Sequence, residues 1–180
     1  MVPRFVEKCI AALESGDKLK TDGVYRQGGN ICTIQKIRLE VDQGKIDILE
    51  TVEDVHVLTG ALKLFFRELK EPLIPWPFVS KLLLAANAQS KKKKIAQIKD
   101  LVAKMPQTHR ETLKTLLQHL VKVAQFKDRN RMQFSNLAIV FGPTLMWPPP
   151  EKVSTVNLAM DLMQQNIIVE ALLNNVESIF

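Results

Sequence analysis

The sequence has 180 residues, 46% of them hydrophobic, which suits one domain with a sizeable core. Lysine and arginine number 25 against 19 acidic residues, and the resulting net charge of +6 favours anionic partners. Aromatic residues make up only 6% and no known nucleic-acid-binding motif occurs, so the composition does not favour nucleic acid as a partner. No apolar run approaches the ~20 residues of a membrane span. We expect a soluble, cytoplasmic monomer that is a fragment of a larger multidomain protein.

Hydrophobic residues recur at helical spacing through most of the chain, and no convincing alternating strand occurs. The predicted helices cover, in chain order, about residues 5–13, 31–43, 53–69, 78–88, 91–105, 108–124, 132–141 and 155–174. Connections of ordinary length join them. The sequence therefore predicts an all-α fold, a single-domain bundle of about eight helices over residues 1–180.

Capping residues mark several of the expected helix boundaries. Asn30 and Ser90 are predicted N-caps, because their side chains can accept from free backbone N–H groups. Thr108 and Glu111 form a predicted capping box, in which each side chain bonds the backbone of the other residue. Proline has no N–H and disrupts a helix interior, so Gly142-Pro143 is predicted to end the seventh helix.

The two cysteines and three histidines predict no metal site or disulfide framework. Cys9 and Cys32 fall at apolar positions of predicted helices, so we expect buried thiols in a reducing compartment. The histidines lie on separate segments, and no Cys-x-x-Cys or His-x-x-x-His spacing occurs. No phosphate-binding P-loop and no Gly-x-Ser-x-Gly elbow is present. Any catalysis therefore needs groups supplied by a partner.

A glycine-rich loop between the first two predicted helices contains one arginine, in GVYRQGG at residues 23–29. An arginine flanked by glycines can extend into the site of a partner protein. Its guanidinium is always charged and presents a planar fork of donors to phosphate oxygens. The alternative for Arg26 is an ordinary solvated surface side chain.

The third predicted helix carries Lys63 and Arg67 one turn apart, opposite its apolar side. The like charges repel slightly, and a carboxylate of this chain or of a partner would offset the repulsion. The alternative is an ordinary solvated helix face. Asn136 lies in a largely apolar segment, where an unsatisfied buried amide costs roughly 1–3 kcal/mol, so we expect fixed hydrogen bonds. It orients a loop, meets a partner or only caps a helix.

Four consecutive lysines, Lys91, Lys92, Lys93 and Lys94, form the strongest run of charge. They open a predicted helix, where cations are slightly unfavourable because of the helix dipole. A solvated helix start is one interpretation. Weak contact with an anionic membrane surface is the other.

Three segments in this order and at these separations resemble the Rho GTPase-activating protein (RhoGAP) domain, over essentially the whole chain. They are DGVYR at 22–26, LKLFFREL at 62–69 followed by EPL at 71–73, and NLAIVFGP at 136–143. The resemblance implies a domain that binds the GTP-bound form of a Rho-family small GTPase and speeds its GTP hydrolysis. It implies no cofactor of its own, because the GTPase holds GTP and Mg²⁺. The chain departs from the family pattern at Lys70, commonly proline, and at Gly28, often serine.

The resemblance also implies roles for particular residues. Arg26 resembles the family's arginine finger, the one catalytic group that the domain contributes. The implied GTPase-binding residues are Lys63, Arg67, Asn136, Pro143 and Asn166. An alternative function is a non-catalytic module that binds active Rho-family GTPases as an effector or scaffold.

Overall fold

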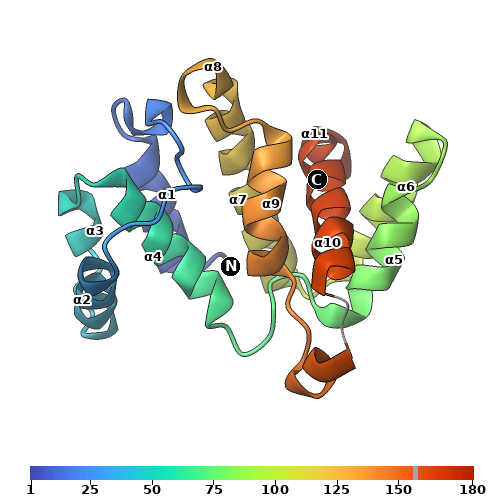
Figure 1. Ribbon diagram of the computed structural model, residues 1–180, viewed down its shortest axis with the longest axis horizontal. Helices are drawn as coiled ribbons and strands as arrows, with labels where there is room; N and C mark the ends of the chain where they lie inside the picture. Colours follow the sequence, from blue (N-terminus) through green and yellow to red (C-terminus); the bar gives the residue numbers. More distant parts are fainter. Residues whose placement is uncertain (156–157) are drawn as a thin grey trace.

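The computed structural model describes the backbone of residues 1–155 and 158–180, and the side chains outside residues 154–159. The described residues form eleven α-helices and two 3₁₀ helices and contain no strand (Figure 1). The elements are α1 (Arg4–Glu14), η1 (Lys18–Lys20), α2 (Ile31–Asp42), α3 (Ile48–Thr51), α4 (Val55–Arg67), α5 (Trp76–Ala86), α6 (Lys91–Ala103), α7 (Gln107–Gln125), α8 (Lys127–Asn130), α9 (Phe134–Leu145), η2 (Pro150–Thr155), α10 (Leu158–Leu173) and α11 (Val176–Ile179).

The all-α prediction is confirmed. The eight longest α-helices each overlap one predicted helix, whereas the three four-residue helices α3, α8 and α11 lie outside the predicted set. Such short helices show no full period of apolar residues, so a periodicity search does not find them. Residues 156 and 157, which the prediction placed in the last helix, lie outside the described residues.

Figure 1 shows α7 and α9 in the middle of the molecule, with α1 to α4 on one side and α5, α6 and α10 on the other. The central position of α7 follows from its apolar stripe, which is fully buried at Leu113, Leu116, Leu117, Leu120 and Val123. Burying a side chain of this size contributes about 1.5–3 kcal/mol relative to exposure. Strong burial along one long helix therefore holds the two flanking groups of helices together.

Two predicted caps are confirmed and the capping box is wrong. The Asn30 side chain accepts from the Thr33 backbone N–H at 3.0 Å, and Ser90 accepts from Lys93 at 3.5 Å. Helix α7 instead begins at Gln107 directly after Pro106, with no side-chain cap. Proline has a fixed φ, so Pro106 can stand directly before the first turn, and Thr108 then lies inside the helix.

Two other expectations fail because local sequence does not determine burial or helix length. Helix α9 runs through Pro143 to Leu145, so the predicted end at Gly142-Pro143 is wrong. The extra turn is stabilised because the Thr144 hydroxyl donates to the Val140 carbonyl at 2.9 Å. Cys9 is buried as expected, but Cys32 is exposed on the outer face of α2. Burial raises the pKa of the Cys9 thiol to about 12.

Two classes of site find no support in the geometry. Along the described stretches, no helix is long and apolar enough to cross a membrane. The described residues also contain no group of three or more His, Cys, Asp or Glu side chains that could hold a metal ion.

Candidate functional site

The loop that carries Arg26, which we call the finger loop (residues 21–29), is irregular but hydrogen-bonded. Gly23 and Tyr25 both adopt the left-handed backbone conformation, with φ of 68° and 69°. The backbone N–H groups of Arg26 and Gln27 both donate to the Gly23 carbonyl at 2.9 Å. The Arg26 side chain is exposed and has no hydrogen-bond or ion-pair partner among the described residues. The loop thus holds its backbone in place and leaves the guanidinium available.

Lys63 lies beneath this loop rather than on a solvated surface. It is only 9% exposed, and its Nζ donates to the Tyr25 carbonyl at 2.7 Å. Burial, with a smaller contribution from the Arg67 charge, lowers the pKa of Lys63 to about 8. The solvated-face alternative is therefore wrong for Lys63, and its acceptor is a backbone carbonyl instead of the carboxylate that the sequence suggested.

Arg67 has a different environment although it lies one turn along the same helix. Its side chain is exposed, and its Nε donates to the Thr144 hydroxyl at 3.2 Å. Thr144 follows Pro143 on α9, so this contact connects α4 to the end of α9. One cation of the predicted pair is internal to the domain and the other is accessible to a partner.

Asn136 lies in the first turn of α9 and is half-buried. Its amide donates to the Arg131 carbonyl at 2.8 Å, and the N-cap position belongs to Gln133, so the cap alternative is wrong. Arg131 has a left-handed φ of 61° and forms a two-bond ion pair with Asp22. The Arg131 guanidinium keeps the pKa of Asp22 below its usual value. Asn136 thereby fixes the backbone at Arg131, whose side chain binds Asp22 at the start of the finger loop.

Asn130 is a structural residue of this site that sequence reasoning missed. It is fully buried, and its backbone carbonyl accepts from the Gly23 N–H at 2.9 Å. Its side-chain amide donates to the carbonyls of Leu19 and Val123 and accepts from the Met132 N–H, each at 2.8 Å. Nothing in the polar run DRNR distinguishes this asparagine from a solvated one, because its partners are fixed by tertiary structure.

Helices α9 and α10 approach closely at a glycine. A β-carbon on Gly142 would lie 3.0 Å from the Gln165 Cβ, closer than most real contacts of this kind. Pro143 follows and is half-buried. With its nitrogen turned toward nearby carbonyls, the Asn166 amide donates to the Ala138 carbonyl at 3.2 Å. Asn166, on α10, therefore bonds α9, which is the helix that carries Asn136 and Pro143.

A family model described as the RhoGAP domain matches residues 3–150. The chain belongs to the RhoGAP domain family. It is 44% identical over 181 aligned residues to both Rho GTPase-activating protein 15 of Gallus gallus and Rho GTPase-activating protein 27 of Homo sapiens. These alignments cover 99% of this chain but only 37% and 20% of the two relatives, so the chain spans a minor part of their length.

Solved structures show the same fold. The crystal structure of human Rho GTPase activating protein 15 superposes with a TM-score of 0.89 at 42% identity, covering 99% of this chain and 84% of that one. The BH domain of Graf, the GTPase regulator associated with focal adhesion kinase, gives a TM-score of 0.81 at 33% identity. That match covers 98% of this chain and 92% of the Graf chain. The resemblance drawn from three sequence segments is thus confirmed at the level of family and fold.

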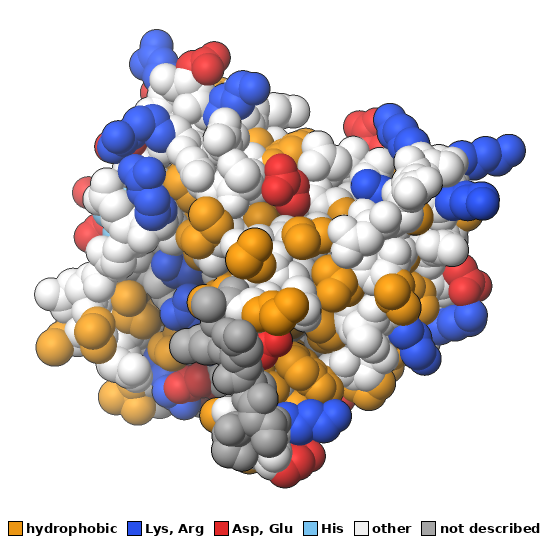
Figure 2. Space-filling view, turned by 45° about the vertical axis from the view of Figure 1, so that its right-hand side comes forward, with side chains coloured by type: hydrophobic (Ala, Val, Ile, Leu, Met, Phe, Trp, Pro, Cys, Tyr) orange, Lys and Arg blue, Asp and Glu red, His pale blue; other side chains and the backbone are white. Residues whose placement is uncertain are grey.

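This RhoGAP domain exposes hydrophobic side chains on α9 and α10, which sequence reasoning also missed. Figure 2 shows orange side chains gathered in the middle of one face, with lysine and arginine toward its edges. Among the described side chains of the two helices, the exposed hydrophobic ones are Ile139 (58%), Met160 (58%), Leu162 (36%), Met163 (66%) and Ile167 (39%). By helical spacing, Ile139 shares a face with Asn136 and Pro143. Apolar residues all round a helix normally indicate burial, and exposed ones mark a surface for a partner.

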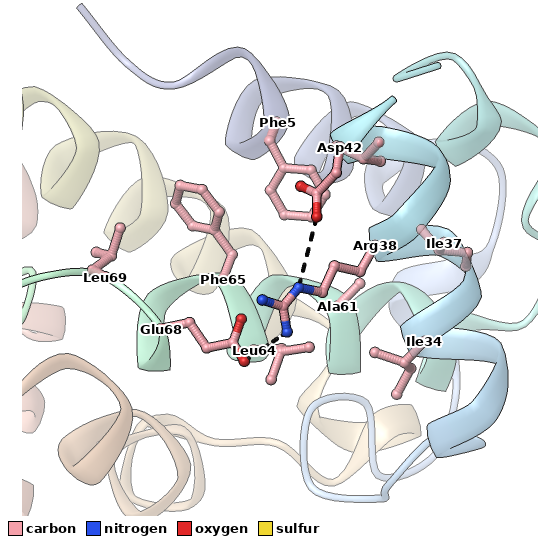
Figure 3. A pocket seen from close by; sticks show the side chains of 11 residues that line it. Phe5, Ile34, Ile37, Arg38, Asp42, Ala61, Leu64, Phe65, Glu68 and Leu69 are labelled. Atoms are coloured by element: carbon pink, nitrogen blue, oxygen red, sulfur yellow. Dashed lines mark hydrogen bonds and ion pairs between the residues drawn. The ribbon is translucent and has the colours of Figure 1, made fainter. Parts of the chain in front are cut away.

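The RhoGAP domain has a hollow beside α4, shown in Figure 3. This cavity of about 190 Å³ lies between α1, α2 and α4, and its walls include Phe5, Ile37 and Phe65. Its one cation, Arg38, already pairs with Glu68 at 2.8 Å and Asp42 at 3.9 Å. This hollow is therefore not suited to a phosphate or an acidic partner side chain.

Side-chain hydrogen bonds link four of the six residues predicted for the site to the finger loop, to its Arg131 anchor or to α9. Lys63 and Asn136 contact the finger loop or its Arg131 anchor, and Arg67 reaches α9 beside Pro143. Asn166 bonds α9 from α10. The run Lys91–Lys94 lies on α6, at the other side of the molecule from the loop (Figure 1).

Proposed function

We propose that this domain binds the GTP-bound form of a Rho-family small GTPase and accelerates its hydrolysis of GTP. The observation that carries the proposal is the exposed, unpartnered Arg26 on a loop whose backbone is held from below. Family membership supports the same partner class, because the relatives are named Rho GTPase-activating proteins. The domain holds no nucleotide of its own, and GTP and Mg²⁺ belong to the partner. It acts as a cytoplasmic monomer.

In this mechanism Arg26 acts as an arginine finger. Negative charge grows on the phosphate oxygens as the γ-phosphoryl group departs. A guanidinium placed there stabilises the transition state more than the ground state, which is the condition for faster turnover. A finger supplied by a partner is worth on the order of 10³–10⁵ in rate, or about 4–7 kcal/mol.

The remaining site residues divide into docking and support. Exposed Ile139 and Met163 offer the apolar centre that protein interfaces commonly have. Exposed Arg67 is suited to steer an acidic surface toward the finger. Lys63 is buried, so its part is support of the loop. Asn136, Asn166 and Pro143 position the face on which the GTPase switch region rests.

The test is single-turnover GTP hydrolysis by purified Rho-subfamily and Rac-subfamily GTPases with this domain. Arg26→Ala should lower the accelerated rate about 10³-fold, while the affinity for the GTP-bound form stays within about tenfold of wild type. Arg26→Lys should restore little, because an ammonium cannot fork across two oxygens. Arg4→Ala, at an exposed arginine on α1, is the matched control and should behave as wild type.

The alternative function is a binding module without catalysis. It predicts that the domain binds GTP-loaded GTPases measurably and that hydrolysis stays at the intrinsic rate. The same experiment therefore decides between the two functions. Acceleration that survives Arg26→Ala would contradict the finger itself.

Membrane contact is a second, independent proposal. Lys91, Lys92 and Lys93 are exposed at the start of α6, and no ion pair to them occurs among the described residues. Leu84, on the neighbouring helix α5, is 76% exposed. Each lysine near an anionic surface contributes about 1 kcal/mol. Sedimentation with phosphatidylserine vesicles should fall when all four lysines become glutamine, and equal binding to neutral vesicles would contradict the proposal.

A further inference from the structure

The geometry points to His119 as a positioning residue for the arginine finger, acting through Tyr25. This inference rests on the proposed function. Tyr25 precedes Arg26 directly, and its hydroxyl lies 2.7 Å from His119 Nε2. The two residues are 94 positions apart in the chain, and both are almost completely buried. His119 never approaches the surface that would meet a GTPase, so its effect on the reaction must pass through the loop.

Tyr25 needs such a partner because its backbone is strained. Its φ of 69° lies in the left-handed region, which costs a residue with a β-carbon roughly 1–2 kcal/mol. Conformations of this kind persist only where the surroundings determine them. The Tyr25 ring packs edge-on against Phe141, with centroids 5.0 Å apart, but this contact does not fix the orientation of the hydroxyl group. The bond to His119 fixes that direction.

The proton arrangement around His119 follows from its other neighbour. Glu14 of α1 accepts from His119 Nδ1 at 2.9 Å and from Lys122 Nζ at 2.7 Å. The hydrogen bond from His119, and then that from Lys122, lower the pKa of Glu14 to about 2, so the carboxylate is ionised and can only accept. Nδ1 therefore carries the proton. Burial lowers the pKa of His119, which keeps Nε2 unprotonated to accept from the Tyr25 hydroxyl.

Tyr25 is thus held at both ends from different helices. His119 on α7 fixes the hydroxyl, and Lys63 on α4 donates to the carbonyl at 2.7 Å. That carbonyl belongs to the peptide unit that joins Tyr25 to Arg26. Its orientation sets the direction in which the Arg26 side chain leaves the loop. A displacement of about 1 Å at such a point can cost about 10² in rate.

The test is single-turnover GTP hydrolysis as a function of domain concentration, with folding checked by thermal unfolding. Tyr25→Phe keeps the ring and its contact with Phe141 and removes only the hydroxyl. It should lower the maximal rate about threefold to tenfold, the value of one lost hydrogen bond, and leave the half-saturating concentration unchanged. His119→Phe should lower the maximal rate at least as much. His119→Gln should retain more activity than His119→Phe, because an amide can still accept from the hydroxyl.

The double variant Arg26→Ala/His119→Phe separates positioning from a general loss of structure. If His119 acts through the finger, the double variant should be no slower than Arg26→Ala alone. An equal fold-loss in both backgrounds, or an effect only on the half-saturating concentration, would overturn the positioning role. Wild-type rates for Tyr25→Phe and His119→Phe would also overturn the positioning role. If Arg26→Ala still lost its acceleration in that case, the proposed arginine finger would stand. Full activity of Arg26→Ala would instead overturn the proposed function, and the positioning role with it.

Discussion

The finger loop and the α9–α10 pair form two parts of one predicted binding surface, and they are held in opposite ways. The loop depends on buried polar contacts from other elements, among them Lys63, His119 and Asn130. The helix pair depends on close contact at Gly142 and leaves hydrophobic side chains such as Met163 exposed. An irregular loop has no repeating hydrogen bonds of its own, so its backbone groups need partners elsewhere. A helix satisfies its backbone internally and needs only a complementary surface.

The finger loop and the α9–α10 pair should therefore lose stability through different kinds of substitution. Deleting one polar atom beneath the loop leaves a buried group without a partner, which costs about 1–3 kcal/mol. Adding one methyl group between α9 and α10 costs energy through overpacking instead. Protonation changes should affect the loop and leave the helix pair unchanged.

The largest expected effect on stability is at Asn130. Asn130→Ala leaves the Leu19 carbonyl and the Met132 N–H without their partner, and it removes one of two donors from the Val123 carbonyl. We expect the free energy of unfolding to fall by about 3 kcal/mol in chemical denaturation. Asn174→Ala, at an exposed asparagine whose side chain donates to the Glu170 carbonyl, should change it by no more than about 0.5 kcal/mol. Similar losses for both variants would show that the buried hydrogen bonds of Asn130 contribute no more to stability than the exposed bond of Asn174.

The next effect is at the end of the finger loop. A β-carbon on Gly29 would overlap the His56 carbonyl oxygen and lie 2.8 Å from the Val57 nitrogen. These are backbone atoms at the start of α4, so Gly29→Ala should displace the loop and lower the maximal rate of GTP hydrolysis by about tenfold to 10².

Gly28 supplies the matched control for that variant. A β-carbon there meets nothing within 4 Å. Gly28→Ala should keep the wild-type rate and stabilise the domain by about 0.4–1 kcal/mol, because it restricts the unfolded chain. A rate loss as large as that of Gly29→Ala would mean that the loop needs flexibility rather than a fixed path.

A smaller effect should appear as a pH dependence at Lys63. Its pKa is lowered from 10.5 to about 8, so its charge is lost as pH rises through about 8, and the charge-assisted bond to Tyr25 weakens. The acceleration should therefore decline above about pH 8, after correction for the intrinsic rate. Stability has the opposite sign, since the unfolded state binds the proton more tightly and folding gains as pH rises from about 8 to 10.5.

Lys63→Met is the variant that checks this assignment. It should lower the maximal rate about tenfold at neutral pH, the upper range for one lost hydrogen bond, and abolish the decline above pH 8. Arg67→Met should weaken binding instead and keep the decline. If Lys63→Met loses only affinity, docking is the role of Lys63 and loop support is not.

The smallest effect is expected in the helix pair. Gly142→Ala places a β-carbon 3.0 Å from the Gln165 Cβ, which a shift of a few tenths of an ångström relieves. We expect the free energy of unfolding to fall by about 1 kcal/mol and the pH profile to stay that of wild type. A change in the pH profile would couple α9–α10 to the loop and remove the contrast between the two regions.

The local features of the fold were predictable because they depend on neighbours in sequence. The eight long helices follow from apolar periodicity, and the Asn30 and Ser90 caps from side chains that bond within one turn. The glycine-rich loop around Arg26 and the three family segments identified the family from sequence alone.

Tertiary structure decided which polar groups became internal. Lys63 and Arg67 look equivalent in sequence, yet one is buried beneath the loop and the other is exposed. Tertiary structure likewise buried Cys9 and left Cys32 exposed. It also extended α9 past Pro143. Tyr25 and His119 meet across 94 residues of chain. The burial and pKa of a side chain depend on what packs over it, and that cover comes from elements that no local pattern connects.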